Sequence, residues 1–136
     1  MANSNYFRIA EHDIRIVFND SDVNSLALID SFLPFKTKCP DGELLFQLTV
    51  DDSLQPVPKE HRHRIRAFDS GNGDTIVDRL DNGGYQYIIK DVYGGCCCLL
   101  IADKEFCDCR CALNGTFSMR DYGLNSALML IMAFAG

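Results

Sequence analysis

Residues 75–113 read TIVDRLDNGGYQYIIKDVYGGCCCLLIADKEFCDCRCAL. Short apolar runs alternate here with polar segments that are rich in the residues of tight turns, first DNGG, then DVYGG, then DKE. Upstream, residues 64–68 read RIRAF and are followed by the turn-like sequence DSGNGD at 69–74. The spacing therefore predicts a meander of antiparallel hairpins from residue 64 to residue 113.

The first half of the chain predicts three more strands and a short helix. Residues 7–18 form two short alternating runs around a polar turn at 11–13, and residues 43–50 form a third run. Three side chains of the second run share one face: Ile14, Ile16 and Phe18. Helix-capping residues before a short apolar segment predict a helix over 22–30, which Pro34 should end.

The end of the chain predicts a helix over residues 118–136 that is apolar on several sides. Such a helix has to be buried on all sides or belong to an interface. The residues assigned to this interface are Leu124, Ala127, Leu128, Leu130, Ile131 and Phe134. The predicted fold class is therefore α+β and mainly antiparallel β, with a hairpin-rich meander sheet, a short helix in the N-terminal half and an apolar C-terminal helix.

Composition fits one domain, formed by residues 1–136. The chain is 47% hydrophobic and has a formal net charge of -6, and an acidic surface repels phosphate backbones. The first residues lack the apolar core of a signal peptide, and the apolar run at 127–135 is much shorter than the roughly 20 residues that cross a bilayer. Nucleic acid and membrane are therefore not expected partners.

The seven cysteines predict packing more than chemistry. Cys107, Cys109 and Cys111 alternate, so on a strand they share one face, and three consecutive cysteines at 96–98 open the preceding strand, while Cys39 stands apart. Cysteine packs as a small hydrophobe, which is the favoured interpretation. A soft-metal site and a disulfide or redox role remain alternatives. The odd number of cysteines and the lack of an export signal favour a reducing, cytoplasmic location.

No other pattern predicts catalysis. His12, His61 and His63 lack a nucleophile or a third ligand at a suitable spacing, and the acidic pair Asp51 and Asp52 has no evident partner. The oxygen-rich 69–74 segment lacks the spacing of an EF-hand and suits a hairpin turn. The motifs GxxxxGK[ST], GxSxG and HExxH are absent from the sequence. We therefore expect no catalytic, cofactor-binding or metal-binding residues, and no catalysis by this chain alone.

The last residues resemble a known family. YGLNSALMLIMAFAG, at 122–136, resembles the segment just before the nucleotide-binding core of HPr-kinase-like proteins. These are serine-kinase relatives, related to phosphoenolpyruvate carboxykinase, that are widespread in gut bacteroidetes. YFRIAEHDIRI at 6–16, SFLPF at 31–35 and ELLFQLTV at 43–50 also resemble this group's amino-terminal region. The resemblance covers nearly the whole chain, in order.

This resemblance implies that residues 1–136 are the N-terminal part of a longer chain. The domain would be non-catalytic and would serve substrate selection, regulation or assembly, with the kinase-like C-terminal domain or a second copy as partner. The sequence contains no phosphate loop, so no ATP-site residue is assigned, and kinase or phosphotransferase activity would need a full-length protein that continues into one. The alternative is a standalone binding module that associates through its C-terminal helix. A cysteine-dependent metal or redox protein is the third hypothesis.

Overall fold

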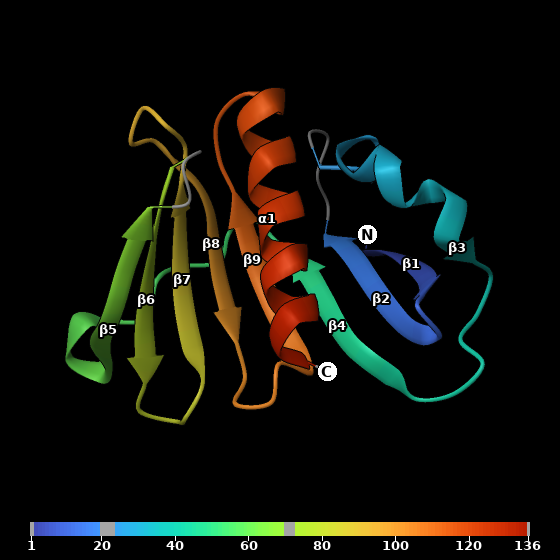
Figure 1. The fold of residues 1–136 in the computed structure, drawn as a ribbon, viewed down its shortest axis with the longest axis horizontal. Coiled ribbons are helices and arrows are strands. Elements are labelled where there is room, and N and C mark those ends of the chain that lie inside the picture. Colours follow the sequence, from blue (N-terminus) through green and yellow to red (C-terminus); the bar gives the residue numbers. More distant parts are fainter. Residues whose placement is uncertain (1, 20–23, 70–72, 136) are drawn as a thin grey trace.

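The computed structural model describes residues 2–19, 24–69 and 73–135. In these residues nine strands form one mixed sheet in the order β3-β1-β2-β4-β9-β8-β7-β6-β5, and the helix α1 (Phe117–Ala135) lies across one face (Figure 1). The strands are β1 (Ala2–Ile9), β2 (His12–Asn19), β3 (Lys36–Thr37), β4 (Leu44–Val50), β5 (Arg62–Asp69), β6 (Asp74–Leu80), β7 (Tyr85–Lys90), β8 (Cys96–Ala102) and β9 (Asp108–Leu113). The fold is therefore α+β, as predicted.

The predicted meander is confirmed. From β5 to β9 each strand pairs antiparallel with the next one along the chain. The connections are the turn segments found in the sequence, and Gly83 adopts a φ of 91° that favours glycine. Asp69 pairs with Asp74 where β5 and β6 approach each other, which confirms the hairpin, although residues 70–72 of its turn lie outside the described residues.

The strands of the N-terminal half are also confirmed. β1 and β2 form a hairpin whose turn residues Ala10 and Glu11 have positive φ angles of 50° and 69°. The side chains that were predicted to share one face of β2 are buried: Ile14, Ile16 and Phe18. On β4 the buried residues alternate in the same way, at Phe46, Leu48 and Val50. These faces belong to the hydrophobic core.

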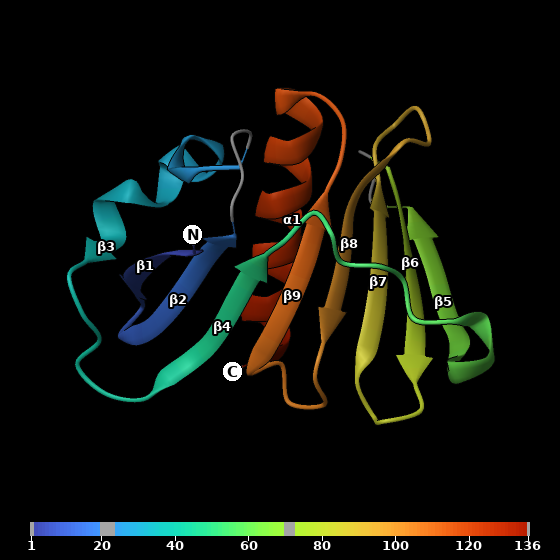
Figure 2. The same cartoon turned by 180° about the vertical axis from the view of Figure 1, so that it is seen from behind.

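The sheet is not antiparallel throughout. β4 is parallel to β2 on one side and to β9 on the other. After β4 the chain crosses the back of the sheet to its far edge, where β5 begins (Figure 2). β5 runs in the same direction as β4. The strands β6, β7 and β8 then alternate in direction, so β9 runs in the same direction as β5 and is parallel to β4, beside which it lies. The expectation of a simple meander sheet is therefore correct for β5–β9 only.

The helix predicted over 22–30 is displaced. The structure has a 3-10 helix, η1 (Leu26–Phe35), with a non-helical residue at Ile29, and residues 20–23 lie outside the described residues. Ser25 caps it, since its hydroxyl accepts a bond from the backbone N–H of Ala27 at 3.3 Å. Pro34 lies inside η1 and does not end it. Two short 3-10 segments that meet at Ile29 do not require the continuous bonding ladder that proline interrupts.

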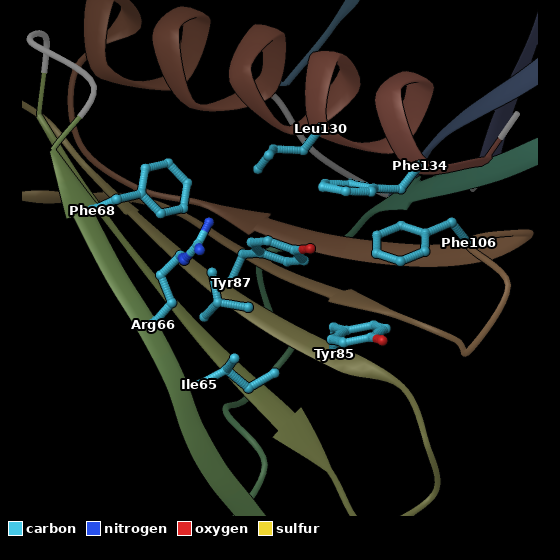
Figure 3. A pocket seen from close by; sticks show the side chains of 9 residues that line it. Ile65, Arg66, Phe68, Tyr85, Tyr87, Phe106, Leu130 and Phe134 are labelled. Carbon is cyan, nitrogen blue, oxygen red and sulfur yellow. The ribbon is translucent and has the colours of Figure 1, made fainter.

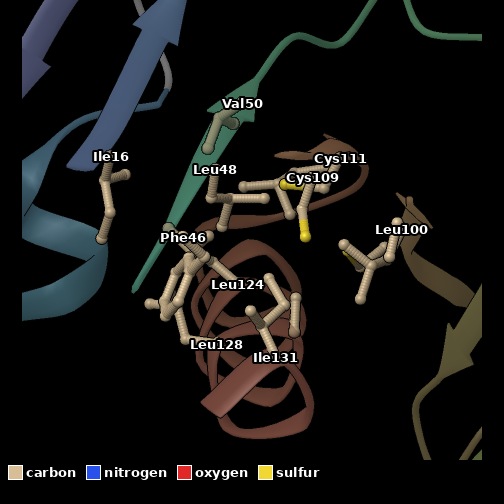
Figure 4. Close-up of a cluster of buried hydrophobic side chains, with 14 of the residues drawn as sticks. Ile16, Phe46, Leu48, Val50, Leu100, Cys109, Cys111, Leu124, Leu128 and Ile131 are labelled. Atoms are coloured by element: carbon tan, nitrogen blue, oxygen red, sulfur yellow. The ribbon is translucent and has the colours of Figure 1, made fainter. Parts of the chain in front are cut away.

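The core lies between the sheet and α1. α1 packs over β8, β9, β7 and β4 and also contacts η1, and Figure 4 shows its side chains pointing into the cluster formed by these strands. Four of the six predicted interface residues are fully buried here: Leu124, Ala127, Leu128 and Ile131. Because the chain's own sheet and η1 cover these four side chains, they cannot contact a partner in this structure. Of the predicted set only Leu130 and Phe134 remain at the surface.

Gly123 sets the distance between α1 and β8. A Cβ atom at this position would lie 2.9 Å from the Cys97 carbonyl oxygen and 3.0 Å from the Cys98 Cβ. We expect Gly123→Ala to lower the free energy of unfolding by about 1–2 kcal/mol, because overpacking costs about 1–3 kcal/mol and the better helix propensity of alanine offsets less than about 1 kcal/mol. Urea unfolding measures the change. Gly42→Ala is the control, since nothing lies within 4 Å of its Cβ position, and equal losses in both variants would contradict the close packing.

Buried polar side chains fix the crossover that follows β4 against the back of the sheet. The Val57 backbone N–H donates to Gln86 Oε1 at 2.8 Å, and the Val57 carbonyl accepts from Arg62 Nε at 2.9 Å. Arg62 also donates to the buried carboxylate of Asp78 at 2.6 Å, which accepts a second bond from Arg64. The back of β5–β7 is therefore a polar, structural face.

No helix among the described residues is both long enough and apolar enough to cross a lipid bilayer. This holds for α1 despite its apolar C-terminal half, because much of its N-terminal half is polar.

Candidate binding site

A cavity of about 300 Å³ lies where α1 stops covering the sheet, over the front of β5–β7 (Figure 3). Five aromatic side chains line it: Phe68, Tyr85, Tyr87, Phe106 and Phe134. The other lining residues are Ile65, Val77, Leu130 and Arg66. The described residues thus form an apolar cavity with a single charged group, and its volume is at the lower end of the range of small-molecule sites.

A β-bulge in β5 places the charged group in the cavity. Before the bulge, Arg64 pairs with Asp78, whose side chain lies on the back of the sheet; after it, Arg66 pairs with Val77, which lines the cavity. The extra residue is Ile65. Since side chains alternate along a strand, Arg66 would point to the back together with Arg64 if β5 were regular. The bulge therefore turns Arg66 to the front.

Phe106 connects the aromatic side chains of the sheet with those of α1. Its ring lies 5.4 Å from that of Tyr85, 6.2 Å from that of Tyr87 and 5.5 Å from that of Phe134, between ring centroids. Phe106 comes from the turn between β8 and β9 and has a φ of 58°. These distances are typical of favourable aromatic pairs, so the rings form a continuous wall.

Polar groups of three residues that line the cavity, Arg66, Tyr85 and Tyr87, have no hydrogen-bond or ion-pair partner among the described residues. Arg66 forms no ion pair or hydrogen bond with them, and the hydroxyl of Tyr87 forms no hydrogen bond with them. Tyr87 is only 5% exposed. Burial, with a smaller contribution from neighbouring Tyr85 and Cys109, raises the pKa of Tyr87 to about 12. The phenol therefore keeps its proton at neutral pH and can donate it in a hydrogen bond.

A second cavity of about 310 Å³ continues along α1 and shares Phe68 and Leu130 with the first. It runs past Tyr122, Ser126 and Met129. Next to it lie the exposed residues of the helix, of which Met129 is 70% and Phe134 59% exposed. We call Met129, Leu130, Ala133 and Phe134 the α1 edge. Large apolar side chains that are exposed next to one another are typical of an interaction surface.

The cysteines mostly pack, as the favoured interpretation predicts. Cys97, Cys98, Cys109 and Cys111 are buried, Cys96 is half-buried, and Cys39 and Cys107 are exposed, all as free thiols. Cys107 does not share the strand face with Cys109 and Cys111, because its N–H bonds to the Asp103 carboxylate at 2.8 Å and so belongs to the turn. The described residues contain no group of three or more His, Cys, Asp or Glu side chains that could hold a metal ion.

Thiol reactivity should follow this burial. Burial raises the pKa of Cys97 and Cys109, and a hydrogen bond with Cys111, followed by burial, raises that of Cys98. Because the thiolate is the reactive form, we expect a disulfide reagent to modify Cys39 and Cys107 rapidly in the folded protein, Cys96 more slowly and the four buried thiols only after unfolding. Mass spectrometry after timed labelling measures this, and rapid modification of Cys109 in folded protein would contradict the packing.

The other singled-out residues are structural or exposed. Asp52 accepts bonds from the Leu113 N–H and Asn24 at 2.9 Å each and from Arg120 at 2.8 Å, so it ties β4, β9 and the start of α1 together. Its neighbour Asp51 bonds to Ser53 in the following turn, and this bond lowers the pKa of Asp51. All three histidines are exposed. His12 lies at the start of β2, while His61 Nδ1 and His63 Nε2 lie 3.0 and 3.3 Å from the carboxylate oxygens of Asp81.

Comparisons of this chain with protein-family models, with curated proteins and with solved structures gave no match. The chemistry of the site is therefore argued from its geometry. The sequence predicted Leu130 and Phe134 as functional residues but missed the rest of the cavity. Alternation of Tyr85 and Tyr87 in β7 was a readable sign of an aromatic face, whereas the bulge that turns Arg66 has no sign in the sequence.

Proposed function

We propose that this chain is the non-catalytic N-terminal domain of an HPr-kinase-like ATP-binding protein, and that it serves assembly by packing its α1 edge against the kinase-like core. The observation that carries this proposal is the exposure of Met129 and Phe134 in the C-terminal half of α1, next to the fully buried Leu128 and Ile131. The sequence resemblance independently suggests a core next to this helix. Seven free thiols agree with a cytoplasmic location.

A second candidate is a standalone module that pairs with another copy through the same α1 edge. The same observation favours it, since in a symmetric dimer the apolar patch of one copy is covered by the same patch of the other copy, and no other partner is needed. The groove beside the edge, lined by Phe68 and Leu130, could receive side chains in either case. The two candidates differ only in what covers Met129 and Phe134.

Methionine methyl NMR distinguishes the candidates. Met129 is exposed while Met119, near the other end of α1, is half-buried and serves as the internal reference. In the isolated, dilute chain a soluble paramagnetic agent should broaden the Met129 methyl signal strongly. In the full-length protein the kinase-like core should cover Met129, so this broadening should be lost while that of Met119 stays unchanged.

Two outcomes would change the conclusion. Protection of Met129 in the isolated chain as its concentration rises would establish self-association, and Phe134→Ser should then restore the broadening. Tyr93→Ser is the matched control, because Tyr93 is 92% exposed in the turn between β7 and β8 and lies away from the α1 edge. A Met129 methyl that stays accessible in the full-length protein and at every concentration would contradict both candidates.

A further inference from the structure

We propose that the cavity between α1 and β5–β7 binds a small aromatic carboxylate, with the carboxylate on Arg66, the ring among the aromatic side chains and a second oxygen at the Tyr87 hydroxyl. This site goes beyond the proposed assembly function. It shares Leu130 and Phe134 with the α1 edge, whereas its charged group and its hydroxyl come from β5 and β7. Binding here would place a small-molecule ligand next to the α1 edge of the domain.

Arg66 selects the charge of the ligand. Of the described residues that line the cavity it alone is charged, and it forms no ion pair with any described residue. Arg62 and Arg64 on the same strand both bind Asp78. A guanidinium group binds a planar carboxylate through two parallel hydrogen bonds. A single guanidinium in an otherwise apolar cavity suits a monoanion better than a phosphate with its greater charge.

Tyr87 supplies the second polar contact. Its side chain is buried and aimed into the cavity, and its hydroxyl lacks a partner among the described residues. The hydroxyl oxygen is not among the buried atoms of the described residues that lack a partner, so it is open to water in the cavity, and a ligand acceptor would take the place of that water. Figure 3 shows this hydroxyl on the side of Phe134 and Phe106, away from Arg66, so the two polar contacts lie at different ends of the cavity and require a ligand with two separated polar groups.

The rings define the body of the ligand. Phe106 joins Tyr85 and Phe134 at centroid distances of 5.4 and 5.5 Å, and Phe68 and Tyr87 add two further aromatic walls. An aromatic ring packs on such walls by stacked or edge contacts. The cavity volume of about 300 Å³ limits the ligand to about one ring with short substituents.

The test is a titration of the chain with 3-(4-hydroxyphenyl)propionate, followed by amide NMR. We expect shifts at the cavity residues and a dissociation constant on the order of 1 mM, as for other ligands of this size. The matched amide, 3-(4-hydroxyphenyl)propionamide, should bind about tenfold more weakly or worse, because it lacks the charge-assisted bonds. 3-Phenylpropionate, which lacks only the ring oxygen, should bind a few-fold more weakly.

Variants assign the two contacts. Arg66→Gln should bind the acid and the amide equally, while Arg110→Gln, an exposed arginine on β9 outside the cavity, should bind as the unaltered chain does. Tyr87→Phe should lose affinity for the hydroxylated probe but not for 3-phenylpropionate. The proposal is overturned if the acid does not bind by about 10 mM, or if Arg66→Gln keeps the preference for acid over amide. Unchanged binding of the hydroxylated probe to Tyr87→Phe would contradict the second contact.

Discussion

Leu128→Asp should leave the chain unfolded. Leu128 is fully buried between α1 and the sheet, so the substitution removes a packed leucine, which alone costs about 2–5 kcal/mol, and introduces a charge without a partner. The combined loss of roughly 5 kcal/mol or more is comparable to the total stability of a domain of this size. Circular dichroism and thermal unfolding measure the result.

Met129→Asp is the matched control on the next residue of the same helix. Its side chain is 70% exposed, so the change in the free energy of unfolding should stay within about 0.5 kcal/mol. The same variant should nevertheless weaken contacts made by the α1 edge. A folded Leu128→Asp variant, or equal destabilisation by both substitutions, would show that α1 does not bury the face described above.

Asp78→Asn should destabilise the chain by about 3 kcal/mol. The substitution removes the negative charge that pairs with Arg62 and Arg64 at a buried site. Breaking a buried ion pair in this way costs about 3–5 kcal/mol. The lower end applies because Arg64 is half exposed. We also expect faster proteolysis of the crossover, since Arg62 holds both Asp78 and the Val57 carbonyl. Asp74→Asn, an exposed aspartate on the same strand, should change stability little.

The loss of stability caused by Asp78→Asn should depend on pH in a defined direction. Burial raises the pKa of Asp78, but the hydrogen bonds and charges of Arg64 and Arg62 outweigh it, so the pKa in the folded state lies below its ordinary value. The carboxylate therefore stabilises the fold at pH values above its unfolded pKa of about 4, and this contribution disappears as the pH falls through the folded pKa. The difference between the unaltered chain and Asp78→Asn should be constant near neutrality and shrink in acid. A difference that grows in acid would contradict the ion pairs.

The strands could be predicted from the sequence because their signals are local. Each run of the meander alternates over a few residues and ends at turn residues, so its place in the chain follows from its neighbours. The position of β9 between β4 and β8 could not be predicted in this way. It depends on a crossover held by Gln86, Arg62 and Asp78, and these are contacts between residues far apart in the sequence. The same reason explains why the parallel pairs were missed.

The site was predicted only in part, because burial of α1 depends on the tertiary structure. The apolar pattern of the helix gave the correct element but could not show which side chains the sheet covers. Leu128 and Phe134 look equivalent in the sequence, yet one is fully buried and the other 59% exposed. The cavity was missed because it also needs the bulge at Ile65 and the turn that carries Phe106. Neither feature has a residue pattern that distinguishes it from an ordinary strand or turn.

The assignment to an HPr-kinase-like protein is the central proposal, and one measurement tests it most directly. The coding sequence downstream of Gly136 should be determined in the source genome. We expect the reading frame to continue into a buried strand and then a GxxxxGK[ST] phosphate loop, which would place a nucleotide-binding core directly after α1. A stop codon directly after Gly136, or a continuation without a phosphate loop, would contradict the assignment.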